Sequence, residues 1–278
     1  MTDSTAPLLI LGCGFTGMAA ARIALAHGRP VIATTRRPEH AAELTRAGIV
    51  AHTSETIGED FVRDRAREGA QVLVTFPPDG ETDARVAAAL PDGCRCVYVS
   101  TTGVYGNRSG RIDASTPVDL ASERAAQRFA AEESWRARGA VVLRAAGIYG
   151  PWRGLHRRVA AGTFRLTEDG RSVVSRIHVD DLAALCLAAL DRGVAGSTFP
   201  VADDEPVPQV EVVRWLVAKL GVAMPASASR EDVHETLRHD RSIDGREVQR
   251  ALGVTLRFPS WREGYDQCFA VEGGALSA

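Results

Sequence analysis

Short apolar runs alternate with helix-like stretches through the first half of the chain, and this alternation restricts the fold more than any other feature. The apolar runs lie at residues 7–11, 30–35, 49–52, 71–76, 94–101 and 139–147. Helical spacing appears between them at 15–27, 38–48, 81–90 and 120–138. Strands that are apolar throughout and separated by helices form parallel sheets covered on both faces. We therefore predict an α/β protein with a Rossmann-type, doubly wound parallel sheet.

The alternation breaks after Gly150. Residues 151–176 are irregular and basic, and "DDLAALCLAAL" then predicts a helix capped by Asp180 or Asp181. A strand is expected at 197–203 and a helix at 208–221. We predict a main domain over 1–150 and a smaller substrate-binding lobe over 151–278. A strand and a helix of the second part are expected to return to the main domain. The lobe should cover the carboxyl edge of the sheet, where such folds bind ligands.

The composition is that of an ordinary soluble globular protein. The 278 residues are 45% hydrophobic and 24% charged, and the net charge is −2. This balance favours a small-molecule substrate and points to neither a nucleic-acid nor a membrane partner. The five cysteines show neither a disulfide framework nor metal-ligand spacing, so no metal is expected. The first residues resemble no leader, and we predict a cytoplasmic protein.

A glycine-rich loop, "GCGFTG", follows the first apolar run and opens a helix. Gly12 permits a tight turn, Gly14 lets the backbone approach a pyrophosphate, and Gly17 lets the helix pack close to the strand. The free N–H groups of the helix start then face the phosphates. Small residues also serve simple packing, so the loop is weak evidence alone. In this strand–turn–helix setting it predicts a dinucleotide-binding domain.

Two arginines follow the second apolar run, in "ATTRRPE". An NAD-preferring site usually has an acidic residue there, which holds the ribose 2′-hydroxyl. Arg36 and Arg37 instead suit a 2′-phosphate, because guanidinium groups form charge-assisted, bidentate hydrogen bonds. The alternative is a pair of solvated arginines at a helix start. We predict that NADP(H) is preferred and that NAD(H) is possible.

Three further motifs carry a resemblance that covers nearly the whole chain. "VYVSTTGVYG" (97–106), "LRAAGIYGP" (143–151) and "RIHVDDLA" (176–183) resemble, in order and spacing, the extended short-chain dehydrogenase/reductases of the nucleotide-sugar epimerase/dehydratase group. The third motif, with "FPSWREGY", is similar to an atypical subgroup. The resemblance implies that the pyrophosphate of the cofactor is contacted by the loop residues Gly12, Gly14, Phe15, Thr16 and Gly17. It also implies that Phe76 and Pro77 line the middle of the cofactor, and that Ala146, Gly147 and Ile148 lie beside the nicotinamide.

The same resemblance suggests residues for the chemistry. Ser100 and Thr101 match the Ser/Thr pair at the end of the fifth strand, and Thr101 would contact the reacting group. Either hydroxyl can instead satisfy backbone groups at the strand end. Tyr105 is either a substrate-side phenol or a core residue. Trp152 and Arg153 either shape the substrate mouth or are loop residues, whereas His178 is expected to pin the smaller lobe.

The Tyr-x-x-x-Lys pair of that family is absent. Its positions fall on Arg124 and Arg128, and no tyrosine occurs between Tyr105 and Tyr149. Arginine stays protonated and cannot replace the phenol as a proton shuttle. Arg128 can still hold the nicotinamide ribose, and Arg124 can bind an anionic substrate group. The alternative is that both point into solvent.

These observations predict an NADP(H)-binding oxidoreductase or epimerase/dehydratase with an atypical site. Its substrate would be a small carbonyl, alcohol or sugar-type molecule, with the proton supplied by Tyr105 or by water. The alternative is a catalytically silent NADP(H)-binding redox sensor or docking protein, favoured by the missing pair. A homodimer is possible through an apolar stripe of Val86, Leu90 and Phe129.

Overall fold

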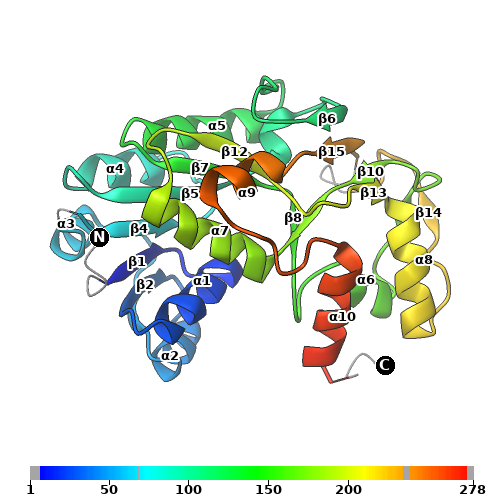
Figure 1. The fold of residues 1–278 in the computed structure, drawn as a ribbon, viewed down its shortest axis with the longest axis horizontal. Coiled ribbons are helices and arrows are strands. Elements are labelled where there is room, and N and C mark those ends of the chain that lie inside the picture. Colours follow the sequence, from blue (N-terminus) through cyan, green and yellow to red (C-terminus); the bar gives the residue numbers. More distant parts are fainter. Residues whose placement is uncertain (1–6, 68, 234–237, 274–278) are drawn as a thin grey trace.

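Seven parallel strands form the central sheet of the computed structural model, which describes residues 7–67, 69–233 and 238–273 (Figure 1). In spatial order the strands are β12 (Thr198–Val201), β7 (Val141–Ala145), β5 (Arg95–Thr101), β4 (Gln71–Val74), β1 (Leu8–Leu11), β2 (Val31–Thr35) and β3 (Val50–Thr53). The chain runs outward from β1 to β3 and then crosses to β4. This crossover leaves a crevice at the carboxyl ends of β1 and β4, where ligands bind in doubly wound sheets. The predicted fold class is confirmed.

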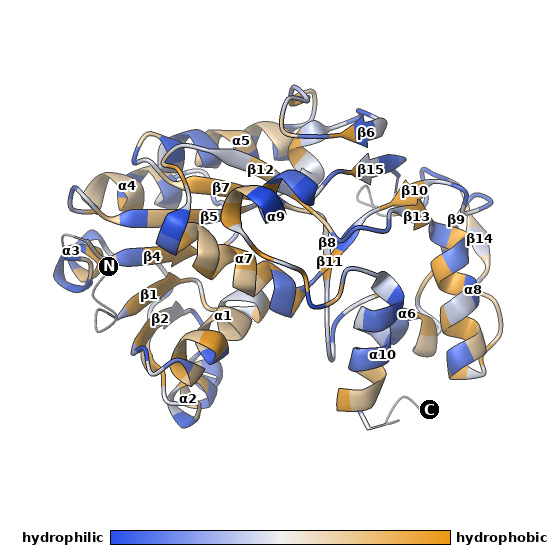
Figure 2. Ribbon diagram, viewed as in Figure 1, coloured by the Kyte–Doolittle hydropathy of each residue, from blue (hydrophilic) through white to orange (hydrophobic). Residues whose placement is uncertain are grey.

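Helices cover both faces of this sheet because successive strand residues point to opposite sides. One face carries α1 (Phe15–Ala26), α2 (Pro38–Arg46), α7 (Val179–Arg192) and α9 (Arg246–Leu252). The other carries α3 (Glu59–Arg65), α4 (Thr82–Ala89) and α5 (Glu123–Arg136). In β1, Leu8 and Ile10 enter the first core and Leu9 and Leu11 the second. Figure 2 shows this strand as apolar along its length. Two hydrophobic cores therefore sandwich the sheet.

The second half of the chain contributes to the sheet and also builds a smaller layer beside it. β12 is the edge strand next to β7, and α7 packs along α1. The smaller layer contains α6 (Leu155–Ala160), α8 (Gln209–Leu220) and α10 (Trp261–Val271), joined by an aromatic core that includes Trp261 and Tyr265. Its two-stranded pairs are β8 (Gly147–Tyr149) with β11 (Arg176–His178), β10 (Val173–Val174) with β13 (Val207–Pro208), β9 (Leu166–Thr167) with β14 (Ser227–Ala228), and β6 (Gly110–Ile112) with β15 (Arg241–Ile243).

Several element boundaries differ from the predictions. α5 begins at Glu123 rather than at residue 120, because the Ser122 side chain accepts a hydrogen bond from the Ala125 N–H and caps the helix. The predicted strand 139–147 is split, since β7 ends at Ala145 and β8 leaves in another pairing. Residues 151–176 contain α6 as well as irregular segments, and α3 was not predicted at all.

The apolar stripe expected at a dimer interface is largely internal. Val86 and Leu90 are buried in the core between α4, α5 and the sheet, and Phe129 is half-buried. Their place in the core of the same chain contradicts their predicted role between two copies. Within the part of the chain that the structure describes, no helix is both long and apolar enough to span a bilayer.

Candidate functional site

The glycine loop turns sharply at Gly12, directly after β1. Gly12 has a φ of +79°, its N–H donates to Thr34 Oγ1 at 2.7 Å, and its carbonyl accepts from Thr75 Oγ1 at 2.7 Å. A Cβ added to Gly12 would lie 2.5 Å from the Cβ of Phe76. The turn therefore requires glycine, and it also fixes Phe76 beneath the loop. Phe76 is half-buried and Pro77 is exposed next to it.

The other two glycines occupy opposite environments. A Cβ on Gly14 would meet nothing within 4 Å, so this backbone faces open space. A Cβ on Gly17 would lie 3.0 Å from Ile10 Cγ2, which is the close approach of α1 to the sheet expected for this position. Phe15 and Thr16 begin α1, with Thr16 buried and Phe15 half-buried. The loop has the geometry of a phosphate cradle at a helix N-terminus.

The two arginines after β2 are exposed at the start of α2. Arg37 approaches Glu39 to 3.9 Å, with both side chains 67% exposed, so this ion pair is weak and leaves the guanidinium accessible. His40, one turn later, brings its Nε2 to 2.8 Å from the Cys13 carbonyl in the glycine loop. This contact fixes α2 to the loop. Sequence reasoning missed it, because nothing local distinguishes His40 from any other surface histidine.

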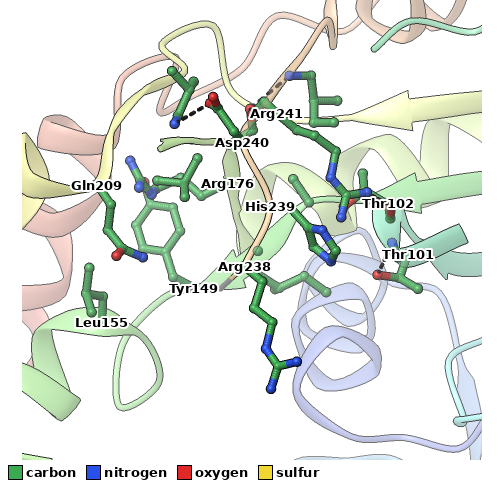
Figure 3. Close-up of a pocket in the computed structure, with 18 of the residues that line it drawn as sticks. Thr101, Thr102, Tyr149, Leu155, Arg176, Gln209, Arg238, His239, Asp240 and Arg241 are labelled. Atoms are coloured by element: carbon green, nitrogen blue, oxygen red, sulfur yellow. Dashed lines mark hydrogen bonds between the residues drawn. The ribbon is translucent and has the colours of Figure 1, made fainter. Parts of the chain in front are cut away.

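A cleft of about 1060 Å³ opens between the carboxyl edge of the sheet and the smaller layer (Figure 3). The structure brings together here eight of the residues proposed from the sequence: Thr101, Arg124, Arg128, Ala146, Gly147, Ile148, Trp152 and Arg153. Among the described residues that line the cleft are ten arginines and one acidic residue, Asp240. Such an excess of one charge in a concave site attracts anions. The glycine loop and the Arg36–Arg37 pair do not line it and form a separate part of the site.

Two contacts connect the cleft to the glycine loop. The Arg153 guanidinium lies over the Phe15 ring, with 5.1 Å from Cζ to the ring centroid. A Cβ on Gly150 would lie 3.1 Å from Phe15 Cζ, so the two loops touch. Trp152, 60% exposed, has a positive φ of 66°, and its N–H donates to Glu272 Oε1 at 2.6 Å. The mouth of the cleft therefore adjoins the glycine loop.

Thr101 ends β5 and caps the short 3₁₀ helix η1 (Thr102–Tyr105). Its Oγ1 accepts a hydrogen bond from the Gly103 N–H at 3.1 Å, which is the backbone role considered from the sequence. The half-buried side chain also lines the cleft. Because a hydroxyl that accepts still has its own proton to donate, Thr101 remains able to bind an oxygen in the cleft.

Ser100 and Tyr105 belong to a buried network instead of the cleft. Ser100 Oγ donates to Glu132, whose carboxylate also accepts from Arg144, with 2.7 Å between Nη2 and Oε2. Arg144 Nη1 donates to the Tyr105 hydroxyl at 3.3 Å. The Tyr105 side chain is fully buried, and burial raises its pKa above the ordinary value. The burial of Tyr105 away from the cleft argues against the prediction that it supplies a proton to the substrate, and the Ser100 hydroxyl is directed to Glu132.

The two arginines that replace the Tyr-Lys pair do face the cleft. Arg124 and Arg128 both line it, one turn apart on α5, as the i, i+4 spacing requires. Arg128 is half-buried, and its Nη1 donates to the Tyr98 hydroxyl at 3.1 Å, which orients the guanidinium. Arg128 is therefore not a freely solvated side chain, whereas Arg124 is exposed where it lines the cleft, and for Arg124 the alternative of a solvated side chain stands.

His178 has a positioning role. Its Nδ1 accepts from the Asp180 N–H at 3.3 Å, so His178 caps α7, where Asp180 or Asp181 was expected. Its Nε2 lies 3.2 Å from Gln267 Oε1 on α10, which ties the smaller layer to the sheet. Asp181 instead accepts the N–H groups of Arg257 and Phe258 at 2.7 and 2.9 Å. The start of α7 therefore holds in place the segment that leads into α10.

Asp203, just after β12, should make stability depend on pH. The side chain is 1% exposed, its Oδ2 has no hydrogen-bond partner, and burial raises its pKa from 3.8 to about 8. Between these two values the folded chain holds one proton more than the unfolded chain. The free energy of unfolding therefore falls by about 1.4 kcal/mol per pH unit as pH rises from about 4 to 8. Urea unfolding of Asp203→Asn should lack this contribution, whereas the exposed neighbour variant Asp204→Asn should retain it. An unchanged pH slope in Asp203→Asn would contradict the assignment.

Comparisons with known proteins agree with this arrangement. The model of the "NAD dependent epimerase/dehydratase family" matches residues 8–202. A 3-diazoavenalumate denitrifying reductase from a Streptomyces species is 32% identical over 138 residues, which is 45% of this chain and 45% of the reductase. A conserved protein of unknown function from Silicibacter pomeroyi is 28% identical, with a TM-score of 0.80 over 96% of this chain and 99% of that one. A dTDP-glucose 4,6-dehydratase from Bacillus anthracis, solved in complex with NAD, is 16% identical and shares the fold, with a TM-score of 0.81 over 97% of each chain.

Proposed function

Because the chain belongs to the NAD dependent epimerase/dehydratase family, we propose that it is an NADP(H)-dependent oxidoreductase. Its substrate is a small carbonyl or alcohol compound held in the arginine-rich cleft. The observation that carries this proposal is the open backbone at Gly14, in a glycine loop whose Phe15 contacts the cleft residue Arg153. A dinucleotide on this loop and a substrate in the cleft would be neighbours. NAD(H) is the second cofactor to test.

The residues of the loop and of α2 fit such a dinucleotide. Gly14 and the first N–H groups of α1 would hold the pyrophosphate, and Arg36 and Arg37 the 2′-phosphate. Arg128 would bind the nicotinamide ribose, and the strip Ala146–Ile148 would lie beside the nicotinamide. When bound, this cofactor supplies or accepts a hydride.

On the substrate side, Thr101 donates a hydrogen bond to the reacting oxygen. The guanidinium of Arg124 neutralises an anionic group of the substrate. With Tyr105 sealed in the core, the described residues offer no phenol at the Thr101 end of the cleft, and we assign the proton to water. This arrangement predicts slow turnover, since a positioned acid or base normally contributes a factor of about 10²–10⁴.

A catalytically silent NADP(H)-binding sensor is the second candidate, and the replacement of the Tyr-Lys pair by Arg124 and Arg128 favours it. NADPH oxidation with a panel of aldehydes, ketones, quinones and aryl diazonium compounds separates the two. Turnover that disappears in Thr101→Ala while NADPH binding persists supports the oxidoreductase. Turnover that survives this change would show that Thr101 is misassigned, and no turnover with any compound favours the sensor.

Removing the two arginines should change cofactor selectivity. We expect the double variant Arg36→Ala/Arg37→Ala to bind NADPH roughly tenfold to a hundredfold more weakly, because charge-assisted hydrogen bonds to the 2′-phosphate are lost. NADH affinity should stay within about twofold, because NADH lacks that phosphate. Calorimetric titration of both cofactors measures the difference. Arg46→Ala, an exposed change at the other end of α2, is the matched control. Equal losses for the two cofactors would contradict the phosphate role, and no binding of either would remove the basis of the proposed function.

A further inference from the structure

Arg176, at the start of β11, lines the cleft although its side chain is almost entirely buried. It is 6% exposed, and its Nη1 is buried without a hydrogen-bond partner. Within the described part of the chain its guanidinium makes no ion pair, and its Cζ lies over the Trp261 ring, 5.9 Å from the ring centroid. A buried charge without a partner is unfavourable, and buried guanidinium groups are normally paired with anions.

Two neighbouring side chains are also buried with a polar atom that has no hydrogen-bond partner. Tyr149 is 2% exposed with an unpartnered hydroxyl, and Gln209 is 3% exposed with an unpartnered Oε1. Both line the cleft, and Figure 3 shows them around Arg176. β8 and β11 pair in register with Gly147 opposite Arg176, which places Tyr149 and Arg176 on one face. Three elements therefore bring unsatisfied polar atoms together in the wall of the cleft, where the Tyr149 hydroxyl also packs against Gly264 of α10.

Asp203 is the nearest internal candidate for an ion-pair partner. It lies close enough for Arg176 to lower its pKa, and its N–H donates to the Arg176 carbonyl at 2.7 Å, yet the two described side chains form no ion pair. Burial outweighs this effect and raises the Asp203 pKa to about 8, so the carboxyl is largely neutral at pH 7. Glu205 and Asp204 face the same carboxyl and disfavour its ionisation further. The positive charge of Arg176 is therefore not neutralised from within.

We propose that Arg176, Tyr149 and Gln209 form an oxyanion subsite that binds a carboxylate or phosphate group of the substrate. Arg176 and Tyr149 donate hydrogen bonds to the oxyanion, and Gln209 accepts one from a hydroxyl of the same molecule. The proposal rests on the proposed function in one respect, the use of the cleft as the substrate site. The other cleft arginines attract anions in general, whereas this buried group selects where the anion is held.

Calorimetry on the full chain tests the subsite without any turnover. The probes are phenyl phosphate, benzoate and the neutral benzamide. We expect at least one anion to bind and benzamide not to bind, and Arg176→Met to weaken anion binding by about tenfold or more. Arg250→Gln, an exposed change on α9 outside the cleft, should alter the affinity by less than about threefold. Binding of phenyl phosphate alone identifies a phosphate substrate, and binding of benzoate alone identifies a carboxylate.

A stability measurement separates this subsite from a structural role. Thermal unfolding of Arg176→Met should show an unchanged or higher Tm, because an apolar side chain replaces an unpaired buried charge. Tyr149→Phe serves as the second variant, and it should weaken anion binding without lowering the Tm. The proposal is overturned if Arg176→Met binds the anions as tightly as the unaltered chain, or if no anion binds better than benzamide. NADPH titration of the same variants identifies a failure of the cofactor assignment independently.

Discussion

Gly12→Ala is expected to destabilise the fold by about 2–5 kcal/mol. The alanine would be held at a φ of +79°, which costs an L-residue about 1–2 kcal/mol. Its Cβ would also lie 2.5 Å from Phe76 Cβ and 2.8 Å from the Phe76 backbone nitrogen. Backbone at that distance cannot swing away, so overpacking adds about 1–3 kcal/mol. Urea unfolding monitored by circular dichroism measures the loss.

Gly14→Ala is the matched comparison two residues along the same loop. Its Cβ would meet nothing within 4 Å, so we expect stability within about 1 kcal/mol of the unaltered chain. The same methyl group would fill the space that a pyrophosphate needs, and NADPH affinity should fall by about tenfold or more. A stable Gly12→Ala chain would contradict the steric argument. Undiminished NADPH binding by Gly14→Ala would contradict the cradle.

Glu132→Ala is expected to destabilise the chain by about 3–5 kcal/mol, because it leaves Arg144 as an uncompensated buried cation. The Glu132 side chain is 0% exposed and that of Arg144 is 7% exposed, and Nη2 lies 2.7 Å from Oε2. The same change removes the acceptor of the Ser100 hydroxyl. Chemical denaturation should therefore give a much lower unfolding free energy.

Glu133→Ala, on the next residue of α5, is the control. Glu133 pairs with Arg136 at 2.7 Å, but its side chain is 52% exposed. An exposed pair of this spacing contributes about 0.3–0.5 kcal/mol. A difference of less than about 1 kcal/mol between the two variants would contradict the role assigned to the buried pair.

Much of the fold was predictable because its determinants are local. Apolar runs predicted the strands β1, β2, β4 and β5. The helical periodicity of apolar residues predicted α1 and α8. The glycine loop was also predicted directly from its sequence. The φ of Gly12 and the close packing of Gly17 follow from the lack of a Cβ, which is a property of the residue itself.

The predictions that differ from the structure depend on tertiary packing, which is not local in the sequence. Tyr105 was placed in the site by its position in a motif, but it ends the 3₁₀ helix η1, and tertiary packing turned this phenol toward Arg144. Val86 and Leu90 were considered as part of a possible dimer interface, because a sequence pattern shows that a helix face is apolar without showing what covers it. Here α5 and the sheet of the same chain cover it.

The sequence by itself determined the layered sheet, the glycine turn after β1 and the absence of a Tyr-Lys pair, since each depends on residues that are neighbours along the chain. Only the tertiary structure decided which polar groups lie at one end of the cleft. Arg176, Tyr149 and Gln209 come from β11, β8 and α8, and no spacing in the sequence relates them. Burial is a property of the assembled fold. The isolation of the Arg176 charge therefore becomes visible only when these elements are packed together.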